Sequence, residues 1–212
     1  MAVYRWEIAR RIHEERVVAI VRAGSAEAAL RAARAILEGG IRVLEVALTT
    51  PGGLEAIRAL AGETDGALVG AGTVLDAETA VAAVRAGARF LVSPGLFPEV
   101  VRAGHRHGVP VLPGAATPTE IAAALEAGAD LVKVFPASAL GPGFVRAVRE
   151  ALPQAPLVPT GGVGADNAAE WLRAGAAALG VGGALTRGDP AGIAARAREL
   201  VAAVRAAASG GT

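Results

Sequence analysis

One residue in this chain is suited to covalent catalysis. The sequence has 212 residues, of which 21 are Lys or Arg, and Lys133 is the only lysine. It lies inside the apolar run 131–135, where a charge is costly to bury. A desolvated lysine can lose its proton near neutral pH and attack a carbonyl carbon to form a Schiff base, which arginine cannot do. Two alternatives remain open: a lysine left by chance on a solvated face, as we expect for Arg31 and Arg34, or one half of a buried salt bridge.

Two glycine pairs are suited to binding a phosphate group. Gly161 and Gly162 follow one apolar run, directly after Thr160, and Gly182 and Gly183 follow the next run. Backbone N–H groups in glycine-rich turns bind phosphate well, particularly beside a helix N-terminus. The simpler alternative is that glycine only permits tight turns between elements.

Arg22 and Thr73 also end apolar runs and could bind an anionic substrate. Arg22 follows residues 17–21, and a guanidinium forms strong charge-assisted hydrogen bonds with a carboxylate. Thr73 ends the sequence Gly-Ala-Gly-Thr and could add a hydroxyl donor. The alternative for Arg22 is a bridge between two loops.

The elements that must position these residues are short strands that alternate with helices. Eight runs rich in Val, Leu and Ala have Gly, Pro or Thr at or close to their C-terminal ends. They cover residues 17–22, 43–49, 67–74, 90–95, 109–115, 131–136, 156–162 and 178–185. Helical patterns fill the gaps, which implies parallel βαβ units, and eight units predict an α/β fold of the (β/α)8 type, a TIM barrel. Both glycine pairs then fall in the loops after strands seven and eight, where such barrels often bind phosphate. An open doubly wound sheet is the alternative, but no Gly-x-Gly-x-x-Gly follows the first strand.

An internal repeat places a carboxylate opposite Lys133. The repeat glycines, one before every second strand, are Gly40, Gly87, Gly128 and Gly175. Alternate strands of a (β/α)8 barrel fill the same interior layer, so the fifth residue after each glycine should share one, and these residues are Glu45, Val92, Lys133 and Gly180. Glu45 and Lys133 would then face each other as an acid–base pair, with an isolated buried ion pair as the alternative. The flanking residues expected to point outward into the helices are Leu44, Val46, Leu48, Val132 and Val134.

Composition and charge exclude several classes of function. With 53% hydrophobic residues, we expect a single domain over residues 1–212, an additional helix over about residues 4–15 at the bottom of the barrel, and a frayed tail after Ala206. The net charge of +1 comes with scattered arginines and no basic stripe, so neither nucleic acid nor an anionic membrane is an expected partner. There is no cysteine, which excludes disulfides and thiolate chemistry. No apolar stretch is long enough to span a membrane and the N-terminus lacks a signal-peptide core, so we expect a cytoplasmic protein.

Several motifs together resemble one enzyme family. They are Val-Leu-Glu45-Val, Gly70-Ala-Gly-Thr73-Val, Ser93-Pro94-Gly95, Pro113-Gly114, Leu-Val-Lys133-Val-Phe135-Pro and Pro-Thr160-Gly161-Gly162. In this order and spacing they cover nearly the whole chain and are similar to the 2-keto-3-deoxy-6-phosphogluconate (KDPG) / 4-hydroxy-2-oxoglutarate (KHG) aldolases. The resemblance implies a class I aldolase that makes or cleaves a carbon–carbon bond to pyruvate. It also implies that the enzyme needs neither a metal nor another cofactor, that its substrate is a small keto acid, and that it is a homotrimer.

The resemblance further implies a role for each matching residue. Lys133 would be the Schiff-base lysine and Glu45 the general acid/base. The residues implied at the pyruvate pocket are Thr73 and Pro94, with Phe135 packed beside it. Those implied at the aldehyde and phosphate end are Thr160, Gly161, Gly162, Gly182 and Gly183.

Two positions depart from the family pattern. Many relatives carry an arginine four residues after the glutamate, where this chain has Thr49, and we expect Arg22 to bind the substrate carboxylate instead. Some relatives carry serine where Ala184 follows the second glycine pair, which puts the strength of phosphate binding in question. The preferred substrate therefore stays open among KDPG, its galactonate epimer and KHG.

Two other classes of function remain open on the same barrel. A phosphosugar isomerase or epimerase would share the glycine loops but would need no Schiff-base lysine, and it would usually need a second acid/base or a metal. The three histidines, His13, His105 and His107, are expected at the surface rather than as metal ligands. A non-catalytic ligand-binding barrel could keep the pocket without turnover.

Overall fold

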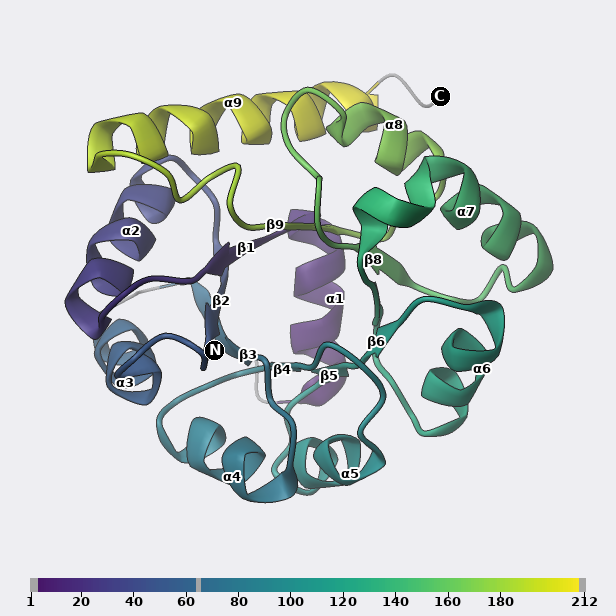
Figure 1. The fold of residues 1–212 in the computed structure, drawn as a ribbon, viewed down its shortest axis with the longest axis horizontal. Helices are drawn as coiled ribbons and strands as arrows, with labels where there is room; N and C mark the ends of the chain where they lie inside the picture. The colour runs from purple at the N-terminus through teal and green to yellow at the C-terminus, as the bar shows by residue number, and fades with distance from the viewer. Residues whose placement is uncertain (1–3, 64–65, 210–212) are drawn as a thin grey trace.

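The chain forms a closed barrel of parallel strands inside a ring of helices (Figure 1). The computed structural model describes residues 4–63 and 66–209. The strands in chain order are β1 (Val17–Val21), β2 (Val43–Ala47), β3 (Leu68–Gly72), β4 (Leu91–Val92), β5 (Val111–Leu112), β6 (Gly114–Ala115), β7 (Val132–Val134), β8 (Leu157–Pro159) and β9 (Leu179–Val181). The helices are α1 (Arg5–Glu15), α2 (Ala26–Glu38), α3 (Gly53–Glu63), α4 (Ala77–Arg85), α5 (Pro98–Arg106), α6 (Pro118–Glu126), α7 (Ala137–Ala151), α8 (Ala168–Arg173) and α9 (Pro190–Ser209).

Parallel pairing closes the strands into a barrel. One sheet has the order β5-β4-β3-β2-β1-β9, and a second has the order β6-β7-β8. β5 and β6 are two parts of one barrel strand, separated at Pro113, whose missing N–H cannot join the ladder. At the other junction, a parallel bridge pairs Thr160, just after β8, with Gly180 of β9. The TIM-barrel fold expected from the sequence is confirmed, because each of the predicted runs contains a barrel strand.

The helix α1 closes the N-terminal end of the barrel. Ile8 and Ile12 of α1 are fully buried, and they belong to one apolar cluster with Val43, Phe90 and Leu131 at the start of three strands. Seen along the barrel, α1 lies across the ring of strands (Figure 1). The helix expected over residues 4–15 is therefore confirmed, and it leaves only the opposite end of the barrel open.

A second apolar cluster packs the helices against the outside of the barrel. Four of the five residues that the sequence predicts to point outward belong to it and are fully buried, namely Leu44, Val46, Val132 and Val134. The fifth, Leu48, follows the end of β2 and packs against this cluster with its side chain only partly buried. Side chains alternate between the two faces of a strand. Glu45 and Lys133, which lie between these residues, therefore point into the barrel.

Two details differ from the expectations. The helix α9 continues to Ser209 instead of fraying after Ala206, because alanines 206–208 are strong helix formers; residues 210–212 lie outside the described residues. His105 is not a free surface residue, since its Nε2 lies 3.2 Å from Oδ2 of Asp130. Among the described helices, none is long and apolar enough to cross a membrane.

Candidate active site

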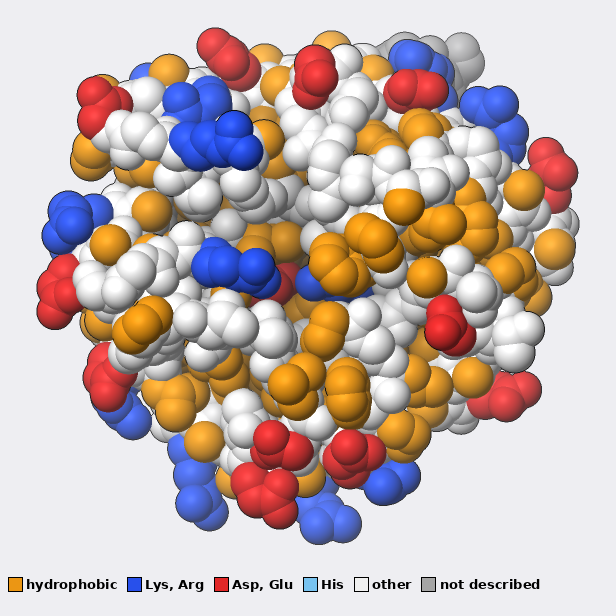
Figure 2. Space-filling view, in the orientation of Figure 1, with side chains coloured by type: hydrophobic (Ala, Val, Ile, Leu, Met, Phe, Trp, Pro, Cys, Tyr) orange, Lys and Arg blue, Asp and Glu red, His pale blue; other side chains and the backbone are white. Residues whose placement is uncertain are grey.

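A large cavity opens at the carboxyl ends of the barrel strands. Its volume is about 920 Å³. Figure 2 shows a hollow at the centre of this face, where acidic and basic side chains meet. The lining includes every catalytic and binding residue predicted from the sequence, namely Arg22, Glu45, Thr73, Pro94, Lys133, Phe135, Thr160, Gly161, Gly162, Gly182 and Gly183. The barrel thus brings residues from nearly all of its strands to one site.

Lys133 and Glu45 lie on the floor of this cavity. Their relative exposures are 8% and 3%, so both ionisable side chains are buried. With Val92 and Gly180 they also line a void of about 10 Å³ inside the barrel, as expected for residues of one interior layer. Among the described side chains, neither forms a direct salt bridge. Both groups therefore border the large cavity without a direct ion pair between them.

Burial governs the protonation of Glu45. Removal from water raises the pKa of its carboxyl above the ordinary value, and the positive charges of Lys133 and Arg22 lower it in part. The first effect dominates because a buried carboxylate loses its hydration. A carboxyl whose pKa is raised above its ordinary value holds a proton more readily, which suits a group that must both accept and return one.

Glycines on neighbouring strands make room for the functional side chains. A Cβ added at Gly72 of β3 would overlap the carboxyl group of Glu45, 2.5 Å from its Cδ. A Cβ added at Gly180 would overlap the hydroxyl of Thr160 in the same way, 3.0 Å from its Cβ. Only glycine at these two positions is compatible with the observed positions of Glu45 and Thr160.

Phe135 and Thr73 shape the space above Lys133. The Nζ atom of Lys133 lies 5.2 Å from the centroid of the Phe135 ring, within the range of a cation–π contact. The Phe135 side chain is 40% exposed, so it presents an aromatic surface to the open cavity. Thr73 has a φ angle of 61°, in the left-handed region that β-branched residues rarely adopt. Such backbone strain concentrates at functional sites.

The first glycine pair is held in a defined loop by Asn167. Gly161 and Gly162 have φ angles of 97° and 73°, which favour glycine. The Asn167 side chain donates a hydrogen bond from Nδ2 to the carbonyl of Gly162 at 2.8 Å. Its Oδ1 accepts a hydrogen bond from the N–H of Gly164 at 3.0 Å. The amide of Asn167 therefore spans the loop and fixes the path of the glycine backbone.

Several lining residues were missed by the sequence reasoning. They are Ile20, Val163, Gly164, Asp166, Thr186 and Arg187. Thr49 and Ala184, which mark departures from the family pattern, also line the cavity. Asp166 follows the first glycine pair closely in the sequence, and Arg187 follows the second. This proximity was the only signal in the sequence that pointed to these two charged residues. Across the described residues, no group of three or more His, Cys, Asp or Glu side chains could hold a metal ion.

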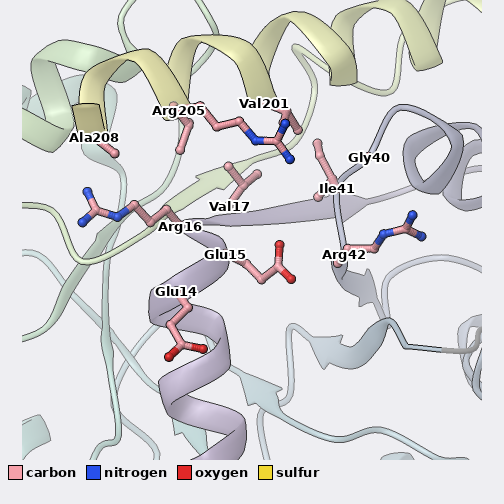
Figure 3. A pocket seen from close by; sticks show the side chains of 11 residues that line it. Glu14, Glu15, Arg16, Val17, Gly40, Ile41, Arg42, Val201, Arg205 and Ala208 are labelled. Atoms are coloured by element: carbon pink, nitrogen blue, oxygen red, sulfur yellow. The ribbon is translucent and has the colours of Figure 1, made fainter. Parts of the chain in front are cut away.

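A smaller cavity at the opposite end of the barrel has mixed charge. Its volume is about 360 Å³, and it lies between the end of α1, the start of β2 and the C-terminal part of α9. Figure 3 shows the guanidinium groups of Arg16, Arg42 and Arg205 pointing in different directions, with the carboxylate of Glu15 between them. Diverging cations around a carboxylate do not form a site for one anionic group. The smaller cavity is therefore not suited to an anionic substrate, whereas the larger cavity contains the predicted site residues.

Comparison with known proteins agrees with this chemistry. The model of the KDPG and KHG aldolase family matches residues 8–194. This chain belongs to the KDPG and KHG aldolase family. It is therefore an aldolase, a lyase that acts on a small keto acid, and the isomerase and non-catalytic alternatives are set aside.

Three relatives show how far the similarity of this aldolase extends. The 2-dehydro-3-deoxy-phosphogluconate aldolase of Treponema pallidum (strain Nichols) is 45% identical over 158 residues, covering 74% of this chain and 75% of the relative. The 2-dehydro-3-deoxy-6-phosphogalactonate aldolase of Escherichia coli (strain K12) is 39% identical over 173 residues, covering 81% and 84%. A crystal structure of the KDPG aldolase from Legionella pneumophila, with pyruvate captured at low pH as a covalent carbinolamine intermediate, matches with a TM-score of 0.79 at 32% identity, covering 94% and 97%.

Proposed function

We propose that this aldolase cleaves a 2-keto-3-deoxy sugar acid to pyruvate and an aldehyde, reversibly, through a Schiff base on Lys133. The observation that carries the proposal is the position of the only lysine of the sequence, buried on the cavity floor together with the buried Glu45. Only lysine among the basic side chains can supply a neutral amine as nucleophile. The carbinolamine captured in the Legionella relative is the first covalent intermediate on this route.

The steps of the reaction use Lys133 and Glu45 in turn. Nζ of Lys133 attacks the keto carbon C2 of the substrate, and loss of water forms a protonated imine. The imine accepts the electron pair of the C3–C4 bond as that bond breaks, which leaves an enamine and releases the aldehyde. Glu45 takes the proton from the C4 hydroxyl and later returns one to C3 of the enamine. Hydrolysis of the resulting pyruvate imine releases pyruvate and restores the amine of Lys133.

The pyruvate half binds on the side of strands β1 to β4. Arg22 ends β1 next to β2, and its charge already acts on the pKa of Glu45. We therefore assign the substrate carboxylate to Arg22, with a neutral hydrogen bond from the hydroxyl of Thr73. Pro94 lines the same side of the cavity, and the ring of Phe135 packs over the imine nitrogen.

The aldehyde half points toward the two glycine pairs. Thr160, Gly161 and Gly162 follow β8, and Gly182 and Gly183 follow β9, which pairs with β1 on the side opposite to β2. Backbone N–H groups at this place in a TIM barrel bind phosphate. We propose KDPG or its galactonate epimer as the preferred substrate, with KHG as a weaker one.

Reductive trapping tests the Schiff base. Treatment with pyruvate and borohydride should add one reduced pyruvyl group, and mass spectrometry should locate it on the peptide that contains Lys133. The Lys133→Arg variant should show neither trapping nor turnover, although it keeps the positive charge. A label found only on the N-terminal amine, or wild-type turnover by Lys133→Arg, would refute the role of Lys133.

We also propose that the enzyme is a homotrimer. The family resemblance supports this assembly, and identical head-to-tail contacts close at three when each turns the next subunit by a third of a circle. The stacked rings of Tyr4 and Trp6 are exposed and offer aromatic surface for a contact of this kind. Light scattering should report three copies of the 21.1 kDa chain. A monomer at micromolar concentration would contradict the proposal.

A further inference from the structure

Arg187 stands at the rim of the large cavity, beside the second glycine pair. It lies between β9 and α9 and lines the cavity together with Gly183 and Thr186. Its Nη2 lies 4.0 Å from the position that a Cβ on Gly183 would occupy. The guanidinium therefore reaches the place where the aldehyde half of the substrate ends, and the mechanism above gives it no role.

The segment that carries Arg187 is held in place from α9. Arg196 of α9 donates hydrogen bonds to the backbone carbonyl of Leu185, at 3.1 Å, and to that of Arg187. Leu185 is buried, and its N–H donates to the carbonyl of Gly182 at 2.8 Å. A side chain on a backbone that is already ordered pays less conformational entropy when it binds a ligand.

Two backbone donors of the loop are already engaged within it. The N–H groups of Leu185 and Thr186 both donate to the carbonyl of Gly182, at 2.8 and 3.3 Å. Ala184 has no hydroxyl to add. A side-chain cation here would add a charge-assisted hydrogen bond to a phosphate, which is stronger than a bond from a neutral backbone N–H.

A carboxylate on the facing loop makes such a cation more important. Asp166 lines the same cavity in the loop after β8, close to the first glycine pair. Its Oδ1 is folded over Gly164, 2.7 Å from the position of a Cβ there. Among the described residues, no salt bridge neutralises Asp166. This carboxylate would repel a phosphate placed between the two loops unless a cation offset it.

We propose that Arg187 binds the terminal phosphate of the substrate and, together with Asp166, determines how strongly the enzyme prefers phosphorylated over unphosphorylated keto acids. The inference rests on the proposed function, because the Schiff base on Lys133 is what directs the far end of the substrate to this loop. Arg187 contributes a charge-assisted hydrogen bond to the phosphate. The carboxylate of Asp166 repels an anion at this loop when the positive charge of Arg187 does not offset that repulsion. Since Arg187 is exposed, added salt weakens its attraction for the phosphate.

Substrates that differ only in the phosphate test the assignment. We would measure kcat/KM for KDPG and for 2-keto-3-deoxygluconate in the wild type, Arg187→Gln and Arg198→Gln. Arg198 is an exposed arginine of α9 outside the cavity lining, which makes it a matched control. Arg187→Gln should lower the ratio of kcat/KM for the two substrates by about tenfold, through KM, as loss of one charged hydrogen bond predicts. Adding Asp166→Asn to Arg187→Gln should recover part of that ratio, whereas an unchanged ratio in Arg187→Gln would overturn the assignment.

A binding measurement separates this inference from the proposed function. Inorganic phosphate, titrated by calorimetry at low salt, should bind the wild type and Arg198→Gln with equal affinity and Arg187→Gln several-fold more weakly. If the wild type binds phosphate in this way but cleaves neither keto acid, the proposed function fails and the role of Arg187 as an anion ligand stands. Equal phosphate affinity in the wild type and Arg187→Gln, or no saturable binding to the wild type, overturns the role of Arg187.

Discussion

A methyl group added at Gly72 should displace the Glu45 carboxyl group while both catalytic residues, Glu45 and Lys133, stay unreplaced. Gly72 ends β3, paired with Ala47 of β2, and a Cβ there would lie 2.5 Å from Cδ of Glu45 and 2.7 Å from its Cγ. Ordinary contacts begin at 3.4 Å, so the carboxyl group of Glu45 must move by about 1 Å. A displacement of that size can cost a catalytic group about 10²-fold in rate.

The stability of the barrel should survive this change. Overpacking a buried site costs about 1–3 kcal/mol, whereas domains are typically stable by about 5–15 kcal/mol. The Lys133 amine lies across the cavity from Gly72 and should still react with pyruvate. We therefore expect Gly72→Ala to fold, to form the pyruvate imine, and to cleave KDPG with a kcat about 100-fold below the wild type.

The assay compares kcat with imine trapping in the same preparations. Pyruvate release gives kcat, borohydride reduction gives the yield of imine, and circular dichroism confirms the fold. Gly62→Ala is the control, because an added Cβ in this part of α3 meets no atom within 4 Å. It should keep wild-type kcat and gain up to about 1 kcal/mol of stability from better helix propensity. A folded Gly72→Ala enzyme with wild-type kcat would show that the carboxyl of Glu45 does not need its observed position, which would refute its role as the acid/base.

Three further substitutions test the remaining assignments. Glu45→Gln should lower kcat by about 10²-fold or more while imine trapping persists, and an unchanged kcat would mean that another group moves the proton. Burial raises the pKa of Glu45 above its unfolded value, so the folded state loses stability as pH rises through the usual carboxyl range. The Glu45→Gln side chain stays neutral, so this variant should resist urea better than the wild type near pH 7 but not near pH 4. Arg22→Ala should raise KM for pyruvate in the condensation direction by about tenfold, with or without phosphate on the aldehyde; an effect confined to phosphorylated aldehydes would reverse our orientation of the substrate. Asn167→Ala removes both hydrogen bonds across the first glycine loop and should raise KM for KDPG with little change in kcat, and equal losses for 2-keto-3-deoxygluconate would indicate a general structural role instead.

The strands and the buried pair could be predicted because their signals are local and periodic. A strand exposes alternate faces, so the apolar residues around Glu45 and Lys133 already determined that these two side chains point inward. The repeat glycines mark every second strand and so place both side chains in one interior layer. The break of one barrel strand at Pro113 was not foreseen, because a proline can also sit at the end of a strand.

By itself, the sequence determined the barrel and the burial of Lys133 and Glu45 in one interior layer, since residue type and period are enough to bury and orient a side chain on a strand. Only the tertiary structure decided the rim of the site. Asp166 and Arg187 lie in loops, where the direction of a side chain depends on turns and on remote contacts, such as the hydrogen bond from Arg196 of α9 to the carbonyl of Leu185. The left-handed backbone of Thr73 is likewise imposed by its surroundings, because its own side chain disfavours it. No local pattern encodes such contacts, so they become visible only once the chain has closed into the barrel.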